Sequence, residues 1–507
     1  MLQFLSHHKN NKIRTPFLIT VLLLSCFSVS AQKVFEFNST CQQAYQEITR
    51  LKINNGLALV QKAREQNPDN LIPELLESYV DFYVLFLNED PKEYAVRYPK
   101  FLERINLISE GPKSSPFYYY CLSMVRVHKA ASAIKFGKMW DAGWDFKRAY
   151  SLIKDNKKQF PTFGPNDLIY GSLQAVTGTI PKGYKWLASI FGMKGSLTEG
   201  MKTVRGFMNS NDPWARVFFN EAAFIYPYLM FYIENKKEEA LAFTQQRRLD
   251  LVNNHLHAYM AANLGINNKQ SEYAESVILA RNKSPEYLRT GVWDFELGFT
   301  RLYHLETQEA AKNLEAFVNN FKGKFYLKDA YQKLSWCYYL QGNMAKAEEA
   351  RANVIKKGAT DADADKQALK DAKSGKWPNM LLLKARLLSD GGYNNEATAL
   401  LHGKSEDDFQ KDEEKLEFAY RMARINDDLG RSDEAIRNYL VAINIGQNRK
   451  EYFAARAALQ IGQIYEKKGQ KALAITYYQK CIDMEDHEYK NSLDQRAKSG
   501  IARCKGE

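Results

Sequence analysis

Apolar residues recur along most of the chain at intervals of three and four positions, the spacing that places them on one face of an α-helix. Residues 458–484, ALQIGQIYEKKGQKALAITYYQKCIDM, show this pattern most clearly. Two apolar-periodic segments lie there on either side of a polar break that contains Gly469. The pattern predicts two antiparallel helices joined by a short turn.

The same unit returns through the C-terminal half with a constant internal spacing. A small residue is followed by a glycine seven positions later and by an alanine five positions after that. The full matches are Gly462, Gly469, Ala474; Ala423, Gly430, Ala435; Ala385, Gly392, Ala397; and Ser335, Gly342, Ala347. Gly298 with Ala310, and Ala262 with Ala274, match in part, and Ala130, Gly137 and Ala142 give one unit in the N-terminal half. From Ala274 to Ala474, successive alanines are 36 to 39 residues apart, except for one step of 50, which predicts a stack of helix pairs with one insertion.

This spacing resembles the tetratricopeptide repeat. Small side chains let paired helices approach closely, so we expect Ala423 to face Ala435 and Gly462 to face Ala474, while tyrosines such as Tyr478 fill the space towards the next pair. The intervening glycine would end the first helix in the left-handed conformation. The resemblance implies an all-α, helix-turn-helix superhelical solenoid.

The 50-residue step places an insertion at residues 358–378, a polar stretch. Asp361, Asp363 and Asp365 have the spacing that begins a calcium-binding loop. Lys366, however, stands where such a loop requires glycine, and no glutamate follows at the twelfth position. We therefore expect a solvated loop with a short helix and no metal.

Residues 165–207 depart from the simple register. Gly171 and Gly178 lie on an apolar helix, and a second helix follows with further glycines, which predicts a helix pair in close contact. The order of residues resembles the signature of the tetratricopeptide-repeat 39 family, which includes fungal outer-mitochondrial inclusion-clearance proteins. The matching positions are Gly178, Pro181, Leu187, Phe191, Gly192, Gly195 and Gly200. This resemblance implies a non-enzymatic, interaction-type role and supplies no catalytic residues; because of the N-terminal segment described next, the chain looks like a bacterial exported relative.

The first residues have the pattern of an export signal. Lys9, Lys12 and Arg14 precede an uncharged apolar run at residues 17–29, and Val29-Ser30-Ala31 gives the small residues that signal peptidase requires. Residues 1–31 are thus predicted to be cleaved, which places the protein in the periplasm or at the outer membrane of a Gram-negative bacterium. The alternative is a lipoprotein acylated on Cys26, since residues 23–26 loosely resemble a lipobox. Membrane association is expected only in that case.

After residues 1–31, we expect one continuous solenoid with a bend near residue 200. Its expected parts are an N-terminal repeat region (32–207, including 165–207), middle repeats (208–357), the insertion (358–378) and C-terminal tetratricopeptide repeats (379–507).

Composition narrows the class of protein further. Hydrophobic residues make up 45% of the 507, which excludes a disordered chain, and 28 Gly with 14 Pro disfavour a turn-rich β-fold. Six cysteines are too few for a disulfide scaffold; five lie beyond residue 31, where buried single thiols are favoured over a bridge between Cys481 and Cys504. The net charge of +12 falls to +9 without residues 1–31 and is dispersed, so no nucleic-acid partner is expected.

The sequence contains no phosphate loop, dinucleotide fingerprint, zincin helix or nucleophile elbow. His255 and His257 are two positions apart and would not face each other on a helix, so we expect solvated or capping histidines. The acidic stretches at residues 406–408 and 412–414 are expected to be hydrated surface. We therefore expect no enzyme, no cofactor and no metal.

Aromatic residues are the remaining candidates for binding. Most should fill space between helices, but tyrosine and tryptophan on an inner surface suit the recognition of peptides or sugars. The candidates for partner binding are Tyr118, Tyr119, Tyr226, Tyr228 and Trp293. The leading hypothesis is an envelope scaffold that binds a peptide or protein partner through the repeat groove; the alternative is a glycan- or small-ligand-binding surface lipoprotein.

Overall fold

The computed structural model describes residues 32–178, 195–246 and 248–506. These residues are helical, and among them the one β-type pairing is an isolated bridge between Val34 and Asn70. The predicted export segment and four residues of the family-like signature lie outside the described residues. Those four are Pro181, Leu187, Phe191 and Gly192.

The N-terminal helices pack around one continuous hydrophobic cluster that runs from Phe37 to Leu264, across the expected division at residue 207. They are α2 (Ser39–Thr49), α3 (Ile53–Gln66), α4 (Ile72–Asn88), α5 (Pro91–Ile108), α6 (Pro116–Lys135), α7 (Met139–Gln159), α8 (Pro165–Gly178), α10 (Leu197–Met208), α11 (Pro213–Val217), α12 (Phe219–Tyr228), the π-helical turn η2 (Leu229–Ile233) and α13 (Lys237–Thr244).

Except for α20, which packs against α18 and α19, the C-terminal helices form consecutive antiparallel pairs, each joined by a short turn, and α27 covers the last pair. They are α14 (His255–Asn267), α15 (Ser271–Ala280), α16 (Val292–Tyr303), α17 (Thr307–Asn320), α18 (Leu327–Leu340), α19 (Met344–Lys356), α20 (Asp363–Ser374), α21 (Met380–Gly391), α22 (Asn394–Leu400), the 3-10 turn η3 (Glu406–Asp408), α23 (Asp412–Asp428), α24 (Ser432–Gly446), α25 (Phe453–Lys467), α26 (Lys471–Asp483) and α27 (Lys490–Lys505).

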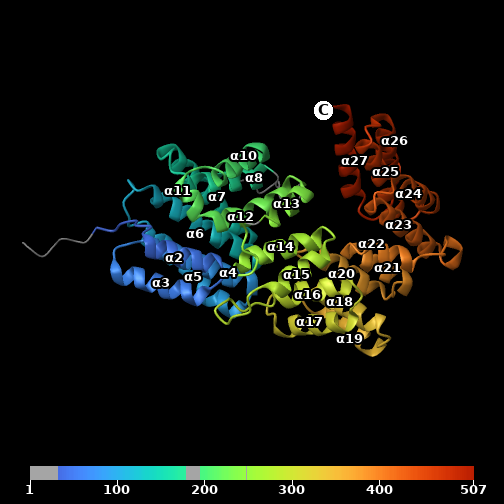
Figure 1. Cartoon of the computed structure of the whole chain (residues 1–507), viewed down its shortest axis with the longest axis horizontal. Helices are drawn as coiled ribbons and strands as arrows, with labels where there is room; N and C mark the ends of the chain where they lie inside the picture. The colour runs from blue at the N-terminus through green and yellow to red at the C-terminus, as the bar shows by residue number, and fades with distance from the viewer. Residues whose placement is uncertain (1–31, 179–194, 247, 507) are drawn as a thin grey trace, which may run out of the picture.

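The helix pairs follow one another along a curved path (Figure 1). The last five helices, α23–α27, rise at the upper right of the view, and α10 and α13 lie to their left, also in its upper half. The turn between α14 and α15 reaches a pair far along the chain, because Lys269 forms an ion pair with Asp428 of α23. No helix among the described residues is both long and apolar enough to cross a membrane. The architecture is an all-α solenoid of stacked helix pairs, as the repeat pattern predicts.

The turn glycines have the conformation expected from the sequence. All five predicted turn glycines have positive φ: Gly137, Gly342, Gly392, Gly430 and Gly469. In the two partial units the corresponding positions are Lys269 and Leu305, and these also have positive φ, at 59° and 63°. The left-handed turn is therefore retained where the glycine is lost, at a cost in backbone strain.

The small residues of the repeat allow close packing, but not always against the expected partner. Ala423 and Ala435 are both fully buried. Gly462 has the ring of Tyr478 as its nearest neighbour instead of Ala474, since a Cβ atom on Gly462 would lie 2.6 Å from that ring. The expected pairing of Gly462 with Ala474 is therefore corrected: glycine is needed here to make room for a tyrosine.

The second helix predicted to open at Pro181 begins outside the described residues, but α8 and α10 of the same segment touch at glycines. A Cβ atom on Gly171 of α8 would lie 2.8 Å from the carbonyl oxygen of Gly200 of α10, and one on Gly200 would lie 2.5 Å from the backbone nitrogen of Ala175. No other residue type fits at this crossing without a backbone shift.

The insertion at residues 358–378 is more ordered than expected. Its helix, α20, packs against α18, and Asp365 is fully buried. The Asp365 carboxylate accepts hydrogen bonds from the backbone N–H groups of Tyr326 and Asp329, at 2.7 and 3.0 Å. The expected short helix is present as α20, but the expectation of a solvated stretch was wrong at Asp365, because this residue caps the first turn of α18.

Candidate functional site

A cavity of about 680 Å³ lies where the N-terminal helices meet the C-terminal pairs. Its walls come from the ends of α4 and α6, from α12 and η2, and mainly from the first helices of successive pairs, α14, α16, α18 and α21. Phe317 of α17, the segment between α17 and α18, and α20 complete the lining. These first helices lie side by side, so the cavity is on the surface where the solenoid presents one helix of each pair.

Twelve of the residues that line the cavity are aromatic. They come from segments far apart in the sequence: Phe86, Phe224, Tyr228, Tyr232, Tyr259, Phe295, Phe299, Tyr303, Phe317, Phe321, Phe325 and Tyr326. Tyr232 and Tyr326 are 55% and 44% exposed, so they lie at the mouth of the cavity. Tyr326 is held there at a positive φ of 59°, with its N–H bound to Asp365 of the insertion.

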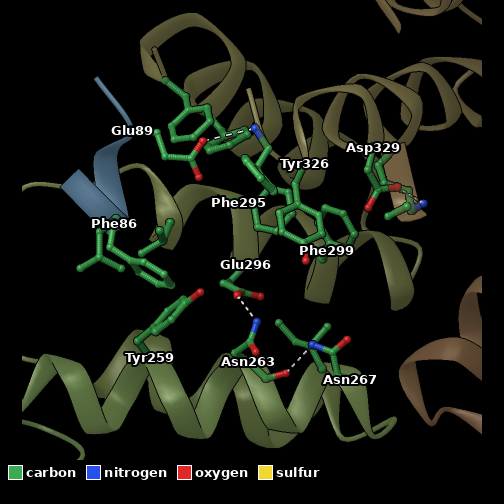
Figure 2. Close-up of a pocket in the computed structure, with 18 of the residues that line it drawn as sticks. Phe86, Glu89, Tyr259, Asn263, Asn267, Phe295, Glu296, Phe299, Tyr326 and Asp329 are labelled. Carbon is green, nitrogen blue, oxygen red and sulfur yellow. Dashed lines mark hydrogen bonds and ion pairs between the residues drawn. The ribbon is translucent and has the colours of Figure 1, made fainter. Parts of the chain in front are cut away.

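Glu296 lies on the floor of the cavity and is 3% exposed. Its Oε1 atom accepts a hydrogen bond of 2.9 Å from the Asn263 side chain, and the Tyr228 hydroxyl donates to the same amide at 3.4 Å. Figure 2 shows the Glu296–Asn263 bond, with the Tyr259 ring rising from the same helix as Asn263. Burial raises the pKa of Glu296 to about 7, and the Asn263 hydrogen bond opposes this shift.

Two lysines line the same cavity, each bound to a carboxylate and to aromatic rings. Lys135 Nζ lies 2.7 Å from Glu89 Oε1 and 4.6 Å from the centre of the Phe86 ring. Lys333 Nζ lies 2.8 Å from Asp329 Oδ1 and 5.6 Å from the Phe299 ring centre. A cation is stabilised in such a position both by the carboxylate and by the ring face.

The charge of Glu296 affects the pKa values of the tyrosines near it. The pKa values of Tyr228, Tyr232 and Tyr259 are all raised, first by burial and in part by the Glu296 carboxylate. Burial and nearby carboxylates, Glu296 among them, also raise the pKa of Tyr326. The four hydroxyl-bearing rings and Glu296 thus share one electrostatic environment.

The residues predicted from the sequence are not brought together. Tyr228 lines the cavity, but Tyr118, Tyr226 and Trp293 are buried elsewhere, and Tyr119 is half-buried against Tyr118. The hydroxyl of Tyr226 accepts a hydrogen bond from Arg205, and Trp293 packs against Tyr259 of the cavity wall. Partner binding by these residues stays a prediction.

Sequence reasoning missed Glu296, although a signal for it exists. Trp293, Glu296, Leu297 and Thr300 are all buried in α16, at the i, i+3, i+4, i+7 positions of one helix face. A glutamate on the apolar stripe of an amphipathic helix is an exception to the pattern and marks a position worth examining.

The two histidines are placed differently from the prediction. His255 and His257 are 3% and 1% exposed, at the start of α14, so the expectation of solvated or capping histidines was wrong. Each Nε2 atom bonds to a backbone carbonyl, that of Asn282 at 2.7 Å and that of Asn220 at 3.2 Å. Burial lowers the pKa of each ring to about 4, so both rings are neutral at pH 7. Both pack in the interior of the protein.

The other candidate chemistries give no site in the described part of the chain. No group of three or more His, Cys, Asp or Glu side chains there is arranged to hold a metal ion. Cys41, Cys121, Cys337, Cys481 and Cys504 are all buried free thiols.

Comparison with known proteins agrees with the repeat architecture. The family profile of the tetratricopeptide repeat matches residues 455–487, which cover all but the first two residues of α25 and the whole of α26. A search of curated proteins finds no match.

Two solved structures resemble this chain at low sequence identity. The TPR domain of P58(IPK) is 15% identical over 85% of this chain and 98% of its own, with a TM-score of 0.22. The APC/C hetero-tetramer Cut9–Hcn1 is 12% identical over 90% of this chain and 95% of the other, also with a TM-score of 0.22. The repeat architecture therefore rests on the helix pairs of this chain and on the matched repeat.

Proposed function

We propose that the protein is a non-enzymatic scaffold of the cell envelope that binds a peptide or protein partner on the inner surface of its solenoid. Stacked helix pairs create extended concave surfaces suited to such partners. The observation that carries the proposal is the aromatic cavity, because it opens on the first helices of successive pairs. Buried aromatic side chains commonly anchor protein interfaces.

The envelope location rests on the export pattern of residues 1–31, and a relation to the tetratricopeptide-repeat 39 family rests on residues 165–207. The close approach of α8 and α10 at Gly171 and Gly200 supports the relation to this family, because the family signature is rich in glycine. Mass spectrometry of the mature N-terminus tests the envelope location. A chain beginning at Gln32 supports release after cleavage, and a chain beginning at acylated Cys26 supports membrane anchoring.

A photo-crosslinking amino acid tests the scaffold role directly. We would introduce it in living cells at Tyr232, at the cavity mouth, and as a control at Leu473 of α26, which is 45% exposed and does not line the cavity. The proposal expects a discrete protein adduct from position 232 that position 473 does not give. Adducts of equal yield from both positions would contradict it.

A second candidate function is the binding of a glycan or another small ligand. The cavity volume favours it, since sites for small molecules commonly measure about 300–1,000 Å³. In this case the crosslinker at position 232 would capture no protein, and added oligosaccharides would raise the melting temperature of the purified chain.

A further inference from the structure

The lining of the cavity has an unbalanced charge at one point. Its three cations each have a carboxylate partner: Lys135 with Glu89, Lys333 with Asp329, and Arg386 with Asp390 at 3.5 Å. Among the carboxylates of the described lining, Glu296 alone has no cationic partner. Its single hydrogen bond, from Asn263, occupies one carboxylate oxygen.

The surroundings of Glu296 share two components with the sites of the two lysines, a buried carboxylate and aromatic residues of the cavity lining. In both lysine sites a carboxylate and an aromatic ring face contact the same ammonium group. Around Glu296, three tyrosines line the same cavity, Tyr228, Tyr232 and Tyr259, and the Glu296 carboxylate contributes to the raised pKa of each of their hydroxyls. The chain supplies two of these sites with its own lysines and leaves the third without a cation among the described residues.

We propose that Glu296 and the surrounding tyrosines bind the cationic end of a basic side chain, preferably arginine, that a partner protein inserts into the cavity. This inference rests on the scaffold function proposed above and names the chemistry of the partner. An inserted cation would offset the cost of burying the Glu296 charge. Tyr232 and Tyr326 line the cavity and are both exposed, so a side chain can reach it from solvent beside them.

Arginine suits the site better than lysine for a physical reason. A guanidinium group is more weakly hydrated than an ammonium group, stacks on aromatic faces and can donate two parallel hydrogen bonds to a carboxylate. The free oxygen of Glu296 and the hydroxyls of the nearby tyrosines are acceptors that can satisfy its remaining N–H groups.

The test uses two small probes on the purified protein. Acetyl-arginine amide carries the cation, and acetyl-citrulline amide has nearly the same shape without the charge. A ligand-detected NMR titration is expected to show binding of the arginine probe and at least about tenfold weaker binding of citrulline. Glu296→Gln keeps the shape and the Asn263 contact, and should weaken binding of the arginine probe at least about tenfold.

Two further variants keep the test decisive. Glu221→Gln changes another buried glutamate, which lies outside the cavity and accepts hydrogen bonds from Tyr45 and Tyr79, and should leave binding unchanged. Tyr232→Ala removes an exposed ring at the mouth, where loss of folding is not expected, and should weaken binding about threefold. Weakening by Glu296→Gln and not by Glu221→Gln supports the proposal.

Other results would overturn it. Equal binding of arginine and citrulline probes, or no binding of either, would show that Glu296 does not select a cation. A third result is that the arginine probe binds but Glu296→Gln leaves the protein adduct at position 232 unchanged. The cavity would then bind a free small cation, and the proposal that a partner's side chain enters it would be wrong. Because the adduct at position 232 is measured separately, the scaffold function can stand or fall independently.

Discussion

The ring of Tyr478 lies directly against the α-carbon of Gly462, and Gly500 of α27 meets the other side of the same ring. A Cβ atom would lie 2.6 Å from the ring at Gly462 and 2.4 Å from it at Gly500. Tyr478 is itself fully buried. Two glycines on different helices thus make the space that one tyrosine fills, and this contact joins α25, α26 and α27.

The first prediction concerns this contact. Gly462→Ala should destabilise the C-terminal helices by about 1–3 kcal/mol, because the added methyl group overlaps a ring that has no room to move. Hydrogen exchange of amides in α25–α27 measures the effect, and faster exchange is expected there and not in α2–α4. Unchanged protection in α25–α27 would show that the ring can shift.

The second prediction separates backbone strain from packing. Gly430 has φ of +74°, and no atom lies within 4 Å of the place that an added methyl group would take, whereas the helical Gly206 is equally uncrowded and has no positive φ. Gly430→Ala should therefore lower the free energy of unfolding by about 1 kcal/mol, and Gly206→Ala should raise it by about 0.5–1 kcal/mol. Urea unfolding of both variants checks the opposite signs; destabilisation by both substitutions would contradict the assignment.

The third prediction concerns pH and Glu221. Burial raises the pKa of Glu221 to about 7, and hydrogen bonds from Tyr45 and Tyr79 oppose the shift. In the unfolded chain the carboxyl has an ordinary pKa near 4.5, so between about pH 4.5 and 7 the folded state binds more protons. This group's contribution to stability is therefore complete below about pH 4.5 and falls as pH rises through 7, by at most about 3 kcal/mol.

The measurement is the difference in unfolding free energy between the wild type and Glu221→Gln across this range. This difference removes the contribution of the buried histidines, which change the unfolding free energy with pH in the opposite direction. His128, for example, has its pKa lowered to about 3, so the protein loses stability as pH falls below 6.5. Relative to the wild type, the variant should gain stability from pH 5 to pH 8. A difference that does not vary with pH would contradict the buried, protonated state.

The sequence predicts the repeats well where a local rule operates. The turn glycines, such as Gly430 and Gly469, follow from a spacing of seven residues and a backbone conformation that glycine favours. The glycine contact between α8 and α10 is likewise expected from the composition of one segment. These features depend on residues close together in the chain, so their pattern is visible without the fold.

The cavity could not be predicted in the same way. Its walls join Phe86, Tyr259 and Tyr326, which are brought together by the curvature of the solenoid and not by any periodicity. Asp365 was expected on a solvated loop because it lies in a polar stretch, and its burial depends on the free N–H groups of α18. The contact of Gly462 with Tyr478 was missed because spacing identifies a small residue but not its neighbour.

The most direct test of the account is photo-crosslinking in cells from position 232 in three backgrounds: wild type, Glu296→Gln and Glu221→Gln. The account predicts one protein adduct in the wild type, its loss or strong reduction with Glu296→Gln, and full yield with Glu221→Gln. An adduct of the same yield in all three backgrounds would contradict the claim that a basic side chain of a partner enters the aromatic cavity and pairs with Glu296.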